Sequence, residues 1–433
     1  MESFFIWGAT LLIAIVIVTP YLLKYRRLQK RDEQRKQKAQ RLGADKAIAQ
    51  YPHIDTLLCI GCGSCVQACP EGGVLGIVDG QATIINGLKC VGHGMCAEAC
   101  PVGAIQVGLG DIQKRDDIPL LSEHYETNIP GLFIAGELGG LALIRNAIAQ
   151  GKAVVDYIAS NTRHKANDGI LDIVIIGAGP AGLSASLAAK QHGLSFVTVD
   201  RQEAGGTILH YPKKKLVLTR PVEIPLYGTL SKKEYLKEEL LSIWQDMQKT
   251  YKLPIRTNNK LKDIRKHDEI FEVICEKESY QSRHVILAMG RRGTPRKLNV
   301  PGEDSSKVMY RLLDAVTYQH NNILIVGGGD SAVEAAIGLA QQAGNTITIS
   351  YRKDTFFRIK KRNEERLRPL VASGKIQILF NSHVHEIRRD SVVVKTEAGL
   401  QTLPNDYVFI FIGGEPPLEP LKKIGIRFGG SAN

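Results

Sequence analysis

The sequence predicts an α/β protein with two nucleotide-binding parts, preceded by a small cysteine-rich module and an apolar N-terminal helix. Three observations predict this organisation. Residues 4–23 carry no charge, seven of the eight cysteines lie between Cys59 and Cys100, and two glycine-rich turns follow apolar segments near residues 177 and 327. A chain of 433 residues is also too long for one hydrophobic core, so several domains are expected.

The first 50 residues combine an apolar run with a basic stretch. Residues 4–23 provide about the 20 residues that an α-helix needs to cross a bilayer. A cleaved signal peptide is the alternative, but no basic residue precedes the run and no small-residue cleavage site follows it. We therefore expect a single-pass anchor over residues 1–23 in the inner (cytoplasmic) membrane, and a basic stalk beside the lipid bilayer over residues 24–50.

The distribution of charge supports this orientation and excludes one class of partner. The formal net charge is +12, and residues 24–41 alone carry nine basic and two acidic side chains. Basic residues on the carboxyl side of an apolar helix place the following domains in the cytoplasm. The remainder of the chain is only mildly basic, which argues against nucleic acid as a partner.

The cysteine-rich module, expected over residues 51–110, contains one pattern twice. Residues 59–70 read Cys-x-x-Cys-x-x-Cys-x-x-x-Cys-Pro, and residues 90–101 repeat this frame with His93 at the second ligand position. Bacterial ferredoxins hold iron–sulfur clusters through this spacing, and the fourth cysteine ligates the other cluster. The module therefore resembles dicluster ferredoxins, which transfer electrons. Zinc is the alternative, but a tetrahedral site needs only four ligands.

The resemblance implies two interleaved sets of ligands. One 4Fe-4S cluster would be held by Cys59, Cys62, Cys65 and Cys100. The second cluster would be held by Cys90, Cys96 and Cys69. His93 leaves the second cluster open, since the imidazole would ligate a fourth iron, or the cluster would be 3Fe-4S, or His93 would be a surface residue beside it.

The first glycine turn has the features of a dinucleotide site. Apolar residues 173–176 predict a strand buried in a parallel sheet. Gly177, Gly179 and Gly182 follow in the G-x-G-x-x-G spacing, which permits a tight turn, close approach of a pyrophosphate and close packing of the next helix. Asp200 ends the next predicted strand, where a carboxylate binds a ribose hydroxyl.

An unusual segment precedes this turn, after a linker expected over residues 111–128. Residues 129–137 read Ile-Pro-Gly-Leu-Phe-Ile-Ala-Gly-Glu, and a helical pattern follows over residues 141–159. Thioredoxin-reductase-like flavoproteins end with a similar stretch, T-x-x-P-G-x-F-x-A-G-D and a helix. The chain therefore resembles this family in a circularly permuted form, with the usual C-terminal piece first. A generic βαβ unit without a ligand role is the alternative.

The resemblance implies that residues 129–302 bind FAD. The loop after residue 205 is most similar to the bacillithiol-disulfide-reductase and ferredoxin–NADP-reductase branches. The implied contacts are the turn, the ribose end, this loop, a returning strand end and the displaced piece: Gly177, Gly179, Pro180, Ala181, Gly182, Asp200, Arg201, Gly206, Thr207, Gly290, Gly136, Glu137, Arg145, Asn146 and Ala147.

A second fingerprint predicts an NADPH-binding domain over residues 303–404, with residues 405–433 returning to the FAD domain. The strand after this fingerprint ends in basic residues instead of an acid. A 2′-phosphate requires cations where an unphosphorylated ribose favours a carboxylate, so NADPH is favoured over NADH. A solvated basic face is the alternative. The predicted contacts are Gly327, Gly329, Asp330, Ser331, Arg352, Lys353 and Arg358.

These parts predict a membrane-anchored oxidoreductase. NADPH would reduce FAD, and electrons would pass to or from the clusters and a partner such as a ferredoxin, a cytochrome or a quinone. No catalytic side chain is expected, because the flavin performs the chemistry. Residues 307–322 contain no C-x-x-C and position 181 is alanine, so disulfide reduction lacks a nucleophile and is an alternative. An electron-entry or redox-sensing subunit of a membrane complex is another. A homodimer is common among the proteins that this chain resembles.

Overall fold

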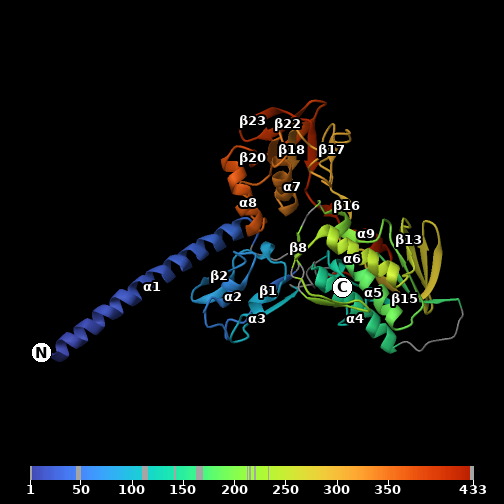
Figure 1. Cartoon of the computed structure of the whole chain (residues 1–433), viewed down its shortest axis with the longest axis horizontal. Helices are drawn as coiled ribbons and strands as arrows, with labels where there is room; N and C mark the ends of the chain where they lie inside the picture. Colours follow the sequence, from blue (N-terminus) through green and yellow to red (C-terminus); the bar gives the residue numbers. More distant parts are fainter. Residues whose placement is uncertain are drawn as a thin grey trace. The chain divides into compact units, whose positions relative to one another are not determined.

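The computed structural model describes residues 2–44, 50–109, 116–140, 143–161, 169–211, 213, 216–218, 221–232 and 234–429. The chain divides into two compact units, each drawn within Figure 1. The first unit comprises Met1–Gly110 with Phe357–Glu365, and the second comprises Asp111–Phe356 with Arg366–Asn433.

The first unit begins with α1 (Glu2–Arg41), one helix that continues past residue 23 through the basic stretch (Figure 1). Within the described part of the chain, none of the helices has both the length and the apolar composition needed to span a membrane. The predicted anchor is therefore not supported by the structure. The side chains of residues 4, 5, 9–11 and 14 lie outside the described part.

The cysteine-rich module is a small α+β fold in the same unit. Antiparallel pairs are formed by β1 (Gln50–Ile54) with β4 (Ile105–Leu109) and by β2 (Leu75–Val78) with β3 (Gln81–Ile84). Two short helices, α2 (Ser64–Ala68) and α3 (Met95–Glu98), occupy equivalent places in the two cysteine patterns, and η1 (Gly87–Lys89) precedes the second. Buried Asp32 joins α1 to this fold, because its Oδ2 accepts the Ile77 N–H at 3.2 Å.

The second unit contains a large mixed sheet with the strand order β12-β7-β6-β15-β14-β13, and β5 also pairs with β15. The first glycine turn joins β6 to α5 at the carboxyl end of β6. The apolar parallel strands are buried, as expected for a sheet covered on both faces. The bounds are β5 (Leu132–Ile134), β6 (Leu171–Ile176), β7 (Phe196–Val199), β12 (Ile255–Arg256), β13 (Leu261–His267), β14 (Ile270–Cys275), β15 (Ser279–Leu287) and α5 (Pro180–Gln191).

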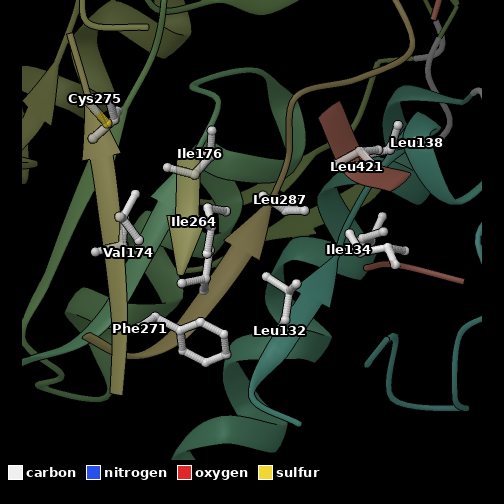
Figure 2. Packing of buried hydrophobic residues seen from close by; sticks show 14 of the residues in the cluster. Leu132, Ile134, Leu138, Val174, Ile176, Ile264, Phe271, Cys275, Leu287 and Leu421 are labelled. Carbon is white, nitrogen blue, oxygen red and sulfur yellow. The ribbon is translucent and has the colours of Figure 1, made fainter. Parts of the chain in front are cut away.

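The segment before the first glycine turn is an integral part of this sheet. β5 lies parallel to β15, with Leu132 opposite Val285, while β6 pairs with β15 on the other side. Figure 2 shows Leu132 and Ile134 beside Leu287 in the buried core. α4 (Ile144–Asn161) follows β5 and packs on α5, where a Cβ at Gly151 would lie 2.1 Å from the Ala181 carbonyl oxygen.

The described part of the predicted linker also forms backbone hydrogen bonds with this sheet and with the C-terminal segment. The Leu120 N–H donates to the Arg427 carbonyl at 2.9 Å, and the Ile134 N–H donates to the Tyr125 carbonyl at 3.0 Å. Ile118 is buried, and Phe428 belongs to the core cluster that contains Leu132. Residues 116–128 therefore hold both the returning C-terminal segment and β5, whereas residues 110–115 lie outside the described part.

The second glycine turn lies in a smaller parallel sheet with the order β17-β24-β18-β19-β20. The turn connects β18 to α7, as the fingerprint predicts. The short pair β16–β25 lies where the chain enters and leaves this region. The bounds are β16 (Thr294–Pro295), β17 (Val308–Met309), β18 (Asn322–Val326), α7 (Asp330–Ala340), β19 (Thr346–Ser350), α8 (Lys361–Ala372), β20 (Ile376–Leu379), β24 (Tyr407–Ile410) and β25 (Gly414–Glu415).

The remaining described elements complete the second unit. A three-stranded antiparallel sheet follows β20, and two short hairpin-like pairs and α6 follow β7. Their bounds are η3 (Glu137–Gly139), η4 (Gly206–His210), β8 (Leu216–Leu218), β9 (Val222–Ile224), β10 (Gly228–Leu230), β11 (Glu234–Leu236), α6 (Lys237–Thr250), β21 (His383–Ile387), β22 (Ser391–Thr396), β23 (Gly399–Pro404) and α9 (Leu418–Lys423).

Candidate functional site

Two cavities in the first unit are lined by cysteines. One is lined by Cys59, Cys62, Cys65 and Cys100. The other is lined by Cys69, Cys90, Cys96 and His93. The last cysteine of each pattern thus lies with the earlier cysteines of the other pattern. This grouping agrees with the interleaved assignment, in which ligation itself stays a prediction.

The surroundings of these thiols suit iron–sulfur clusters. The Ala82 N–H donates to Cys59 Sγ and the Ala104 N–H donates to Cys100 Sγ, both at 3.3 Å, and such bonds tune the potential of a cluster. Burial raises the pKa of Cys65 and of Cys90 to about 11. A bound cluster would therefore replace a proton at each thiol. In the described ranges, no group of three or more His, Cys, Asp or Glu side chains is placed so that it could hold a metal ion.

His93 lies beside the second cavity together with a buried carboxylate. Its Nε2 is 3.8 Å from Glu71 Oε1, and both residues line the cavity. Glu71 also lies 3.5 Å from Lys360 Nζ, within the same unit. His93 is therefore positioned next to the three cysteines, and its role as a ligand stays a prediction.

In the first glycine turn, the start of α5 packs so closely on the end of β6 that a side chain at Gly182 would not fit. A Cβ at Gly182 would lie 1.7 Å from the Gly177 carbonyl oxygen, and Gly177 itself has a φ of 110°. Gly179 caps α5 without a side-chain hydrogen bond, so the first N–H groups of α5 are available for a pyrophosphate. Pro180 and Ala181 begin this helix. The backbone geometry therefore fits a dinucleotide.

Asp200 has a structural role that sequence reasoning missed. Its Oδ2 accepts the Ala178 N–H at 2.7 Å, and its Oδ1 accepts the Gln202 N–H at 2.8 Å. Burial raises the pKa of the carboxyl group. Asp200 therefore braces the glycine turn from the end of β7. This role is visible only in the contact between Ala178 and Asp200, which are 22 positions apart, and no local sequence pattern indicates it.

The segment between β5 and α4 and the loop after β7 both meet the first glycine turn. The Gly136 N–H donates to Oε1 of buried Gln150 at 2.7 Å, and an added Cβ at Gly136 would lie 3.1 Å from Ala181 Cβ. An added Cβ at Gly206 would lie 2.8 Å from Gly179 Cα. The structure thus gathers three glycine-containing segments that are distant in sequence.

The other predicted FAD contacts lie at the ends of the same elements. Glu137 begins η3, and its pKa is raised by burial and lowered to a smaller extent by Arg291. Gly290 follows the end of β15, and Thr207 lies in η4. Arg201 follows Asp200, and Arg145, Asn146 and Ala147 lie in the first turn of α4. Their contacts with FAD stay predictions.

The second glycine turn is shaped by an aromatic residue that sequence reasoning did not assign. A Cβ at Gly328 would lie 2.3 Å from the ring of buried Tyr351, which stacks on Phe356 at 5.4 Å between ring centroids. Gly327 has a φ of 137°, and Gly329 caps α7 without a side-chain hydrogen bond. Asp330 and Ser331 begin α7, so this turn also leads into a helix N-terminus, which favours an anionic ligand.

The predicted cations divide between the two units. Exposed Arg352 and half-buried Lys353 directly follow Tyr351 at the carboxyl end of β19, beside the glycine turn. Arg358 is exposed and belongs to the segment 357–365 of the first unit. The geometry therefore favours Arg352 and Lys353 as partners of a 2′-phosphate, whereas the role of Arg358 stays a prediction.

Comparisons with known proteins agree with both parts of this site. The family model for pyridine nucleotide-disulphide oxidoreductases matches residues 174–431, which is more than half of the chain. The chain belongs to this family. A model for a 4Fe-4S dicluster domain matches residues 51–101. The family assignment identifies an FAD-dependent NAD(P)H oxidoreductase, and the second match adds an iron–sulfur module.

Individual relatives come from several branches of the family. A ferredoxin–NADP reductase of Ignicoccus hospitalis is 32% identical over 267 residues, which cover 60% of this chain and 82% of the relative. The bacilliredoxin reductase Bdr of Bacillus subtilis is 28% identical over 261 residues, covering 59% of this chain and 80% of the relative. The structure of bacillithiol disulfide reductase Bdr from Staphylococcus aureus matches with a TM-score of 0.55 and 28% identity, over 59% of this chain and 80% of that protein.

The cysteine grouping predicts distinct effects of single substitutions on iron content. We expect Cys65→Ser to remove about half of the bound iron, because only one of two interleaved clusters loses a ligand. Cys96→Ser should remove the other half and leave a different electron paramagnetic resonance (EPR) signal. Buried Cys275→Ser in the second unit is the control and should retain all of the iron. Iron analysis with low-temperature EPR measures the effect, and equal iron in all three variants would contradict the grouping.

Proposed function

We propose that this protein transfers electrons between NADP(H), FAD and two ferredoxin-type clusters, and exchanges them with an external ferredoxin-like partner. The observation that carries the proposal is the presence, in one chain, of two nucleotide turns and two cysteine-lined cavities. Relatives named ferredoxin–NADP reductase support this proposed function. Bound FAD would accept a hydride from NADPH and release its electrons singly to the clusters.

The residues of this chain serve the proposed reaction by binding and positioning. The first turn, braced by Asp200, would hold the FAD pyrophosphate at the start of α5. The second turn, supported by Tyr351, would hold the NADPH pyrophosphate at the start of α7. Buried Cys65 and Cys96 would keep water away from the clusters. None of these steps requires a side-chain acid or base.

Disulfide reduction is the second candidate, because relatives named Bdr match the same region. Cys275 is the one cysteine of this chain outside the cysteine-rich module. It is buried in β14, and burial raises its pKa to about 11. A reactive thiol is accessible and has a lowered pKa, so Cys275 does not suit the role of a nucleophile.

We also infer a circular permutation of the flavoprotein. The family match begins at Val174, after β5 and α4, and the matched relatives extend beyond their matched part by about one fifth of their length. β5 and α4 nevertheless belong to the FAD sheet and its core. These observations support the interpretation that residues 129–161 replace the C-terminal piece of the relatives.

We further propose that residues 4–23 attach the protein to the inner (cytoplasmic) membrane, with its other domains in the cytoplasm. The run is uncharged, and apolar side chains such as Trp7, Leu12 and Val16 are exposed on α1. Extended exposed apolar surface marks contact with lipid or protein. We expect the full chain to stay in carbonate-washed membranes and a variant lacking residues 2–23 to become soluble. Recovery of the full chain in the soluble fraction would exclude this attachment.

Stoichiometric anaerobic titration with NADPH tests the proposed electron route. We expect the visible absorption of FAD to bleach, followed by the appearance of reduced-cluster signals in low-temperature EPR, because both centres lie on one route. The Cys65→Ser variant should retain flavin reduction and lose one cluster signal. Reduction of FAD while both clusters remain oxidised at equilibrium would refute electron flow from NADPH to the clusters.

Cofactor selectivity tests the assignment of Arg352. We expect Arg352→Gln to raise the KM for NADPH about tenfold or more, since a charge-assisted hydrogen bond to phosphate is lost. The KM for NADH should change little, because NADH lacks the 2′-phosphate. Arg389→Gln removes a charge from an exposed site between β21 and β22 and is the matched control. Steady-state reduction of ferricyanide reports both values, and equal changes for NADPH and NADH would contradict the assignment.

A further inference from the structure

A cluster of basic side chains lies in the second unit, around His210 in η4. Arg311 Nη1 donates to His210 Nδ1 at 3.3 Å, and His210 Nε2 donates to Gln202 Oε1 at 2.8 Å. Arg201 Nη2 donates to the Arg292 carbonyl oxygen at 3.1 Å. The members therefore come from four places in the chain, namely the loop after β7, η4, the segment between β15 and β16, and the loop after β17. We call Arg201, His210, Arg292 and Arg311 the basic cluster.

His210 is neutral and does not compensate the cations around it. Its Nδ1 accepts a hydrogen bond from a guanidinium, so the proton of the neutral ring must be on Nε2. Burial lowers its pKa to about 4, with further lowering by Arg292, Arg311, Lys237 and Arg201. Lys237 adds a further cation near His210, because its Nζ donates to the carbonyl oxygens of the flanking residues Leu209 and Tyr211.

Among the described residues, the guanidinium groups of the basic cluster have little anionic compensation beyond the electrostatic interaction of Arg201 with Asp200. No ion pair joins Arg201, Arg292 or Arg311 to a described carboxylate, and Nη1 of Arg292 is buried without a hydrogen-bond partner. Adjacent Arg291 shows the contrast, because its Nη2 lies 2.6 Å from Asp117 Oδ2. A buried, unpaired guanidinium nitrogen is costly, and neighbouring cations add repulsion. An anion would relieve both costs.

We propose that the basic cluster is a binding site for a phosphate group, with Arg292 Nη1 as its buried donor. A guanidinium presents a rigid fork of donors that matches phosphate oxygens. Arg201 directly follows Asp200, which braces the first nucleotide turn, and Arg311 precedes β18 of the second nucleotide fold. The phosphate therefore belongs either to the FAD diphosphate or to NADP(H). This site rests on the proposed binding of FAD and NADP(H), but it does not depend on the direction or route of electron flow.

Ligand affinities of the full-length protein test this site. The variants are Arg292→Gln and, as the matched control, Arg296→Gln, which removes the same charge at an exposed position four residues later. FAD affinity is measured by flavin fluorescence during release and rebinding, and 2′,5′-ADP affinity by calorimetry. We expect Arg292→Gln to weaken at least one of the two about tenfold. The control should leave both unchanged, and circular dichroism with thermal unfolding checks that both variants fold.

The two arms identify the source of the phosphate. Weakened FAD binding alone assigns the cluster to the flavin diphosphate, and weakened 2′,5′-ADP binding alone assigns it to NADP(H). Unchanged affinity for both ligands would overturn the proposal. If Arg292→Gln fails to fold, the wild-type protein supplies the measurement: inorganic phosphate should raise its Tm more than chloride at equal ionic strength. Equal Tm values would overturn the proposal, whereas the NADPH titration decides the electron route separately.

Discussion

The second unit depends on the close approach of backbone atoms around the first glycine turn. Gly182 brings α5 against the carbonyl oxygen of Gly177, and Gly151 brings α4 against the carbonyl oxygen of Ala181. A methyl group at either position would overlap these oxygens, so both helices require glycine there. Because α4 follows β5 and α5 follows β6, this contact joins the segment that precedes β6 to the nucleotide turn. The shape of the predicted FAD site thus depends on both pieces of chain.

Buried ionisable side chains have different surroundings in the cysteine-rich module and in the flavoprotein. In the cysteine-rich module, burial raises the pKa of thiols, so cluster assembly must remove protons from Cys65 and Cys90. In the flavoprotein, Asp200 is buried but accepts two backbone N–H groups, which offset part of its desolvation. Arg292 has no such compensation on Nη1.

The sequence predicted features that depend on local spacing and missed those that depend on distant contacts. The fold of both glycine turns and the dicluster domain is confirmed, because glycine and cysteine spacings directly constrain a short stretch of backbone. The brace of Asp200 on Ala178 and the ring of Tyr351 under Gly328 were missed, because each crosses between strands. The basic cluster was missed for the same reason, since Arg201 and Arg311 are 110 positions apart.

The position of β5 ahead of the first glycine turn determines what the iron–sulfur module is attached to. Only residues 110–115 separate β4 of this module from residues 116–128, which are bonded to β5 and to the C-terminal segment. The connection therefore ends directly on the FAD sheet. On the proposed route, a short covalent connection makes electron exchange between module and flavin intramolecular, at an effective concentration far above that of a free ferredoxin. Such exchange does not require a charged docking surface to bring the partners together, which is consistent with segments 56–69 and 99–107 around Cys59 and Cys100 containing no charged residue.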